Sequence, residues 1–75
     1  MTRYLNIGGS SGVKAYEILE DGIIIRFSDG SEYLFTNSSA GALGITEMKN
    51  LAHKGRGLNR YVNLKVKNKY ERKLR

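Results

Sequence analysis

The sequence predicts an α+β domain, with a three-stranded antiparallel β-meander packed by one main α-helix and followed by a basic C-terminal segment. Three observations support this prediction. Two Asp-Gly dipeptides, Asp21-Gly22 and Asp29-Gly30, separate runs of β-branched and aromatic residues. A later stretch carries apolar residues at helical spacing and ends at Gly55. Positive charge is concentrated after that glycine. A chain of 75 residues is expected to form a single domain, residues 1–75.

The second hairpin has a predictable register. A three-residue loop of Ser28, Asp29 and Gly30 places Gly30 at the left-handed position of a type I turn with a bulge. A two-residue loop would divide the aromatic residues between the two faces of the sheet, so the three-residue loop is preferred. The predicted cross-strand pairs are Phe27–Ser31, Arg26–Glu32 (an ion pair), Ile25–Tyr33, Ile24–Leu34 and Ile23–Phe35.

Residues 13–19 read as the first strand of the meander. A two-residue loop of Asp21 and Gly22 would place Ile18 opposite Ile25 and Leu19 opposite Ile24. One face then forms the predicted core: Tyr16, Ile18, Ile23, Ile25, Phe27, Tyr33 and Phe35. The second face carries an apolar patch of Leu19, Ile24 and Leu34, over which the early residues Tyr4, Leu5 and Ile7 could lie.

Residues 8–12 are Gly/Ser-rich and read as a flexible turn. The alternative, a phosphate cradle, is disfavoured because no strand and helix flank the turn as required, and no Lys-Ser/Thr pair ends it.

The main helix is expected to cover the core face. Asn37, Ser38 and Ser39 are candidate caps. Two glycines in the following residues weaken the first turns by about 1 kcal/mol each, so a start near Thr46 is expected. Gly55 suits a left-handed stop. The predicted buried side of the helix is Ile45, Met48, Leu51 and Ala52.

Two interpretations of the C-terminal segment stay open. Apolar residues recur at every fourth position, a spacing that would place them on one side of a helix. They are Leu58, Val62, Val66, Tyr70 and Leu74. Residues 62–67 also alternate between apolar and polar, which is typical of a strand. A short helix over residues 58–63 is favoured, residues 62–70 are left as helix or strand, and the last residues are expected to fray.

The charge distribution points to a function in binding. Residues 54–75 contain nine basic residues and one acidic residue, a net +8, whereas residues 1–53 carry a net −2. There is one histidine, no cysteine and no carboxylate pair placed to divide acid and base roles. We therefore expect no enzyme activity, no catalytic residues, no metal site and no cofactor.

Arginine and lysine attract phosphates, and tyrosine can stack on unpaired bases, so RNA or another single-stranded nucleic acid is the predicted ligand. The loop of Lys54, Gly55, Arg56 and Gly57 could also bring backbone amides close to a phosphate. The predicted nucleic-acid-binding residues are Lys54, Arg56, Arg60, Tyr61, Lys65, Lys67, Lys69 and Arg72.

Simpler interpretations compete with this one. Tyr61 and Tyr70 could be core residues that cover the sheet, with the charges merely solvated. A protein partner or a second copy of the chain could instead bind the patch of Leu19, Ile24 and Leu34, or an unpaired edge strand. No apolar run approaches the length of a membrane span and no signal peptide is recognised, so no membrane partner and a cytoplasmic location are expected.

Several short motifs together resemble the KTSC domain, a small module similar to the C-terminus of some lysyl-tRNA synthetases. The resemblance covers roughly residues 10–71 and rests on Ser11 and Val13, Phe27 with Gly30, Tyr33-Leu34-Phe35, Ala52-His53-Lys54-Gly55, Asn59 and Tyr70. The chain departs from the pattern at Phe35, at His53 and in residues 37–44 before the helix. The resemblance implies a small α+β module and, as has been suggested for that family, RNA binding.

Overall fold

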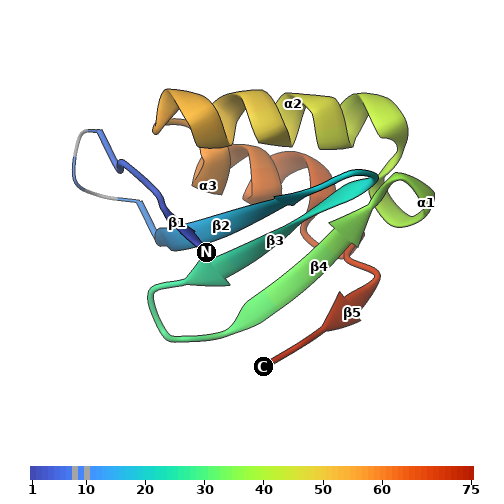
Figure 1. Cartoon of the computed structure of the whole chain (residues 1–75), viewed down its shortest axis with the longest axis horizontal. Helices are drawn as coiled ribbons and strands as arrows, with labels where there is room; N and C mark the ends of the chain where they lie inside the picture. The colour runs from blue at the N-terminus through green and yellow to red at the C-terminus, as the bar shows by residue number, and fades with distance from the viewer. Residues whose placement is uncertain (8, 10) are drawn as a thin grey trace.

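The computed structural model describes residues 1–7, 9 and 11–75. One antiparallel sheet forms the first layer, and helices lie on one side of it as the second layer (Figure 1). Five strands are present among the described residues, in the order β1 (Thr2–Arg3), β2 (Val13–Leu19), β3 (Gly22–Phe27), β4 (Glu32–Thr36) and β5 (Arg72–Lys73). The predicted meander is therefore the centre of the sheet, but the prediction of three strands missed a two-residue strand at each edge. Gly8 and Ser10 of the predicted Gly/Ser turn lie outside the described residues.

The helical layer is larger than the predicted single helix. It contains α1 (Asn37–Ala40), the main helix α2 (Ala42–Lys54), α3 (Leu58–Tyr61) and the π-helix η1 (Val62–Val66). The helix α2 begins at Ala42 rather than near Thr46, because Asn37–Ala40 forms a separate turn that ends at Gly41 with φ 84°. Thr36 caps that turn: its hydroxyl accepts from the Ser39 N–H (3.2 Å), and Ser39 Oγ accepts from the Thr36 N–H (3.0 Å).

The β3–β4 hairpin confirms the predicted register. Ile23, Ile24, Ile25 and Arg26 lie opposite the partners expected from the sequence. The Phe27 N–H donates to Ser31 O (2.8 Å) and closes a three-residue loop in which Gly30 has φ 90°. That conformation favours glycine, so Gly30 fixes the turn and the turn fixes which side chains face the core.

The β2–β3 hairpin differs from its prediction. Gly22 lies inside β3, the loop is Glu20-Asp21, and Ile18 pairs with Ile23 instead of Ile25. Gly22 is needed within the sheet because a Cβ atom there would overlap the backbone carbonyl of Phe35. The shift is by two residues, so Tyr16, Ile18 and Leu19 keep their faces. A β-bulge between Val13 and Ala15 changes the alternation at the start of β2 and places Val13 opposite Phe27, in the core. Ile18, however, moves to the end of the sheet and is 39 % exposed, so its assignment to the core was wrong.

The core lies between the sheet and the helical layer. Phe35, Ile23 and Ile25 from the strands meet Ile45, Met48 and Ala52 of α2, as expected. Tyr4 also belongs to this core, whereas Leu5 and Ile7 are exposed. The Ile7 N–H donates to Gly55 O (2.7 Å), so the N-terminal segment runs past the end of α2 and the expectation that it covers the second face was wrong.

The C-terminal segment folds as a helix followed by a strand. Leu58, Val62 and Val66 are buried on one side of α3 and η1, which excludes the strand interpretation for Val62–Val66. Beyond η1 the helical stripe is not continued, because β5 pairs with β4. The Glu71 N–H donates to Leu34 O and the Leu74 N–H donates to Glu32 O, both at 2.7 Å, so the expected fraying of the last residues was wrong.

Candidate nucleic-acid interface

All nine basic side chains of residues 54–75 are exposed to solvent. Among the described residues, the only one of them in an ion pair is Arg75, whose Nη1 lies 3.6 Å from Glu32 Oε2. The remaining eight cations are thus free of a carboxylate partner within that part of the chain. They do not all lie together, because the segment first crosses the helical layer and then joins the edge of the sheet (Figure 1).

Two of the predicted binding cations, Arg60 and Lys65, meet at a shallow hollow between α2 and the α3–η1 segment. Arg60 lies in α3, and Lys65 lies in η1, which follows α3 directly. Tyr61, half-buried against the core, forms part of the wall. This helix hollow has a volume of about 180 Å³ and is lined by Leu51, Gly57, Arg60, Tyr61, Leu64 and Lys65.

A second hollow of about 180 Å³ adjoins the first. Arg60 and Gly57 line both, and Arg56 enters from the loop between α2 and α3. Gly55 and Gly57 both adopt left-handed φ values, 78° and 83°, which turns the chain sharply around Arg56. This loop hollow is lined by Tyr4, Ile7, Ser11, Arg56, Gly57, Asn59 and Arg60, and neither lining contains a carboxylate.

The other predicted binding residues are not brought to these two hollows. Lys54 is the last residue of α2, while Lys67 and Lys69 follow η1. Arg72 lies in β5 opposite Leu34, so its side chain is on the sheet face away from the helices. The predicted binding residues that the fold gathers are therefore Arg56, Arg60, Tyr61 and Lys65.

The loop amides play a structural role. The Gly55 N–H donates to Leu51 O (3.0 Å) and Ala52 O (3.2 Å) and so closes α2, as the left-handed stop predicted from the sequence requires. The Gly55 amide is therefore already used within the fold, so of the loop amides that were predicted to approach a phosphate this one does not take part. The Arg56 side chain of the same loop is exposed and lines the loop hollow.

The aromatic residues divide between core and surface. Phe35 is buried, and Tyr33 is half-buried with its ring centroid 4.8 Å from that of Tyr70. Tyr70 itself is 39 % exposed, so it covers the edge of the core only in part. The Lys73 ammonium lies 5.7 Å from the centre of the Tyr33 ring, within the range of a cation–π contact.

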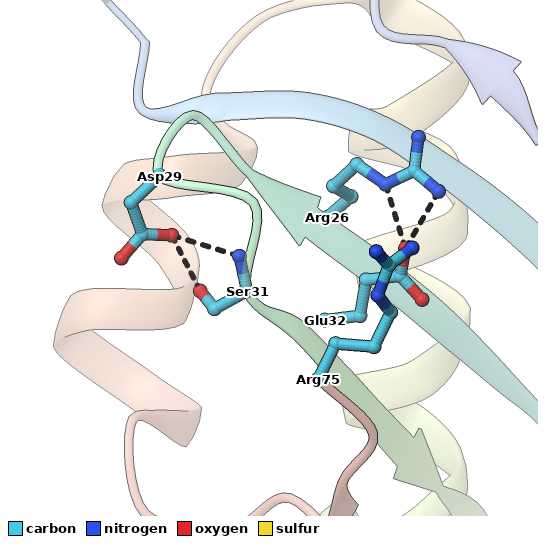
Figure 2. Close-up of polar contacts among 5 residues, drawn as sticks. All are labelled: Arg26, Asp29, Ser31, Glu32 and Arg75. Carbon is cyan, nitrogen blue, oxygen red and sulfur yellow. Dashed lines mark hydrogen bonds and ion pairs between the residues drawn. The ribbon is translucent and has the colours of Figure 1, made fainter.

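The sheet face away from the helices combines an apolar patch with an ion-pair cluster. Ile24 lies opposite Leu34 as predicted, but Leu19 lies opposite Gly22, and all three apolar side chains are half-buried. Beside them Arg26 donates through Nε to Glu32 Oε2 (2.7 Å), and Arg75 approaches the same oxygen (Figure 2).

The single histidine, His53, is exposed in the last turn of α2 and packs edge-on against Tyr16, with ring centroids 6.1 Å apart. In residues 1–7, 9 and 11–75 no group of three or more His, Asp or Glu side chains is arranged to hold a metal ion. The described helices also include none that is long and apolar enough to span a bilayer.

The sequence did not predict that Leu51 and Leu64 line the helix hollow. Leu51 was assigned to the buried side of α2, but it lies at the border of the core, where one side of it remains open. Leu64 falls outside the helical stripe of Leu58, Val62 and Val66, and it is 67 % exposed. The sequence did contain one signal for Leu64, because an apolar residue outside the buried stripe of an amphipathic helix is expected to be exposed.

Comparisons of the chain with protein-family models, with curated proteins and with solved structures found no match. The resemblance to the KTSC domain therefore stays a prediction.

Proposed function

We propose that this protein is a non-catalytic binding module for RNA or another single-stranded nucleic acid. The observation that carries the proposal is the pair of adjoining hollows lined by Arg56, Arg60, Lys65 and Tyr61, with no carboxylate in either lining. Cations that lack carboxylate partners remain available for phosphate groups.

The chemistry of the helix hollow suits a nucleotide. Each cation that neutralises a phosphate releases counterions, which supplies affinity without sequence preference. Tyr61 and the apolar side chains of Leu51 and Leu64 line the same hollow as Arg60 and Lys65 and offer a surface for an unpaired base. Base stacking on an aromatic ring contributes about 1–3 kcal/mol per base. Charge and apolar surface therefore occur in the same place, as a single strand with exposed bases requires.

The test compares two triple variants that lose the same charge. Arg56→Ala/Arg60→Ala/Lys65→Ala removes the cations of the hollows, and Lys67→Ala/Lys69→Ala/Lys73→Ala removes three exposed cations outside them. Binding to a fluorescent single-stranded RNA is measured by anisotropy across a salt series. The hollow variant should bind about tenfold or more weakly, and the slope of log K against log salt should fall in magnitude by about 2, at roughly 0.7 per phosphate.

Two results would contradict the proposal. Equal losses in both triple variants would mean diffuse attraction by net charge rather than binding in the hollows. No binding of the natural protein to RNA or DNA at low salt would remove the function, and the patch of Leu19, Ile24 and Leu34 would then be the better candidate surface for a partner.

A further inference from the structure

A third hollow lies at the N-terminal side of the sheet, outside the basic segment. It is formed by β1, β2, β3 and the turns beside them, and its volume is about 880 Å³. Three cations, Arg3, Lys14 and Arg26, belong to its wall, and none of the lining residues is acidic. This sheet hollow is lined by Met1, Arg3, Tyr4, Leu5, Asn6, Ser11, Val13, Lys14, Ala15, Arg26 and Ser28.

The sheet hollow adjoins the loop hollow, because Tyr4 and Ser11 line both. The segment that separates them is held at three points by hydrogen bonds. The Tyr4 N–H donates to Lys14 O (3.0 Å), the Leu58 N–H donates to the Tyr4 hydroxyl (3.3 Å), and the Ile7 N–H donates to Gly55 O. These contacts tie β1 to both β2 and the start of α3, so the neighbouring positions of the two hollows are fixed by the fold.

The helix, loop and sheet hollows thus follow one another over the surface. Together their linings hold six cations and no carboxylate, although the chain has seven acidic residues. Arg3 and Lys14 are exposed, and neither forms an ion pair within the described ranges. Arg26 uses Nε and Nη2 to bind Glu32, which leaves Nη1 for another acceptor (Figure 2).

A row of this kind fits an extended polyanion better than a compact one. A small anion needs a single cluster of donors, whereas these six cations are spread over three joined hollows of a molecule 31 Å long. Apolar side chains, among them Leu64 and Leu5, accompany the cations at both ends of the row. Bases of a single strand can contact such side chains, whereas bases in a duplex are paired and stacked inside it.

We propose that the three hollows form one continuous track for a single strand of RNA, which runs from Lys65 past Arg60 and Arg56 to Lys14 and Arg3. This inference rests on the proposed function and extends it, since it places half of the track in the part of the chain that carries a net negative charge. Small single-strand-binding domains occupy about 4–16 nucleotides, and a track across the whole molecule belongs in that range.

The experiment compares Arg3→Ala/Lys14→Ala with Lys69→Ala/Lys73→Ala, which loses the same charge outside the track. Binding of a fluorescent oligouridine of about 12 nucleotides is followed by anisotropy over a salt series. Phosphate contacts by the five cations named on the track give the natural protein a slope of log K against log salt near −3.5, at roughly 0.7 per contact. The Arg3/Lys14 variant should bind more weakly, with a slope about 1.4 smaller in magnitude, and the control should keep a slope close to that of the natural protein.

A measurement on the unmodified chain removes any dependence on how the variants fold. When the oligonucleotide of about 12 nucleotides is added, backbone amide NMR signals near Arg3 and Lys14 should shift together with those near Arg60 and Lys65. If the natural protein binds RNA while the Arg3/Lys14 variant keeps its slope, or if the signals near Arg3 and Lys14 do not shift, the track is refuted and the proposed function stands. If the natural protein binds no RNA, both fail.

Discussion

Asp29 shows how one side chain holds a turn. Its Oδ1 accepts from Ser31 Oγ (2.6 Å) and from the Ser31 N–H (2.9 Å), and the next residue, Gly30, takes the left-handed conformation (Figure 2). Hydrogen bonds to the ionised form stabilise it, so the pKa of Asp29 lies below its ordinary value of 3.8, with the Ser31 hydroxyl as the largest cause. A group with a lowered pKa stabilises the fold above its unfolded pKa, and this contribution is lost as the pH falls through the folded value.

Ser31→Ala tests this arrangement. The substitution removes the hydroxyl donor but keeps the backbone donor, so the pKa of Asp29 should rise part of the way toward 3.8. Titration of the Asp29 carboxyl carbon by NMR measures the change directly. An unchanged pKa would mean that the hydroxyl does not bind the carboxylate in solution.

The hairpin of β3 and β4 depends on a polar pair as well as on its turn. Arg26 and Glu32 lie opposite each other on the face away from the helices, at the end next to the loop. The Glu32 side chain is only 10 % exposed, whereas those of Arg26 and Arg75 are 35 % and 69 % exposed. Burial of the Glu32 carboxylate is compensated mainly by the closer of its two charged donors. Loss of that donor would leave a nearly buried charge poorly paired and would destabilise the fold.

Arg26→Ala should therefore be more destabilising than Arg75→Ala. Loss of Arg26 leaves a nearly buried carboxylate without its 2.7 Å donor, which costs about 1–3 kcal/mol. Loss of Arg75 removes a solvent-exposed contact at 3.6 Å and should cost less than about 1 kcal/mol. Urea unfolding at neutral pH compares the two variants. Equal costs would contradict the idea that Glu32 depends mainly on Arg26.

The complete fold gives the basic segment two structural roles. The α3–η1 part supplies Leu58, Val62 and Val66 to the core, and β5 closes the edge of the sheet beside β4. Thr36 Oγ1 donates to Glu71 Oε1 (2.7 Å), which links the cap of α1 to the start of β5. The segment is therefore an integral part of the domain, and its cations are presented from fixed positions.

Deleting residues 71–75 tests the role of β5. The deletion removes the hydrogen bonds from Glu71 and Leu74 to β4 and should lower stability by about 2–3 kcal/mol, at roughly 1 kcal/mol per bond. The Glu32 amide, which now donates to Arg75 O, should exchange its hydrogen faster, while the Ile25 amide of the central strand reports global unfolding. Unchanged exchange at Glu32 would mean that β5 does not pair in solution.

Elements with local signals were predictable. Gly30 and the alternating residues around it fixed the β3–β4 register, because a one-residue slip would have moved Phe35 out of the core. The stop of α2 at Gly55 was predictable for the same kind of reason. The β2–β3 register was not, since Gly22 is required by the closeness of the Phe35 carbonyl, a contact that only the assembled sheet creates.

The candidate site was predictable only in part. The concentration of positive charge after Gly55 identified Arg56, Arg60 and Lys65, but the same count included Lys67, Lys69 and Arg72, which the fold directs elsewhere. A count of charges along the chain does not say toward which surface each side chain points. Which cations share a surface depends on where the helix ends and the strand begins.

The chemistry of adjacent residues was sufficient to predict the central hairpin, the end of the main helix and the excess of positive charge. The two edge strands and the three joined hollows depend on residues distant in the chain: β1 pairs with β2, β5 pairs with β4, and Tyr4 lies against Leu58. A strand of two residues has no periodic pattern of its own, because its stability comes from hydrogen bonds to a neighbour. Those neighbours are distant in the sequence and adjacent only in the folded domain.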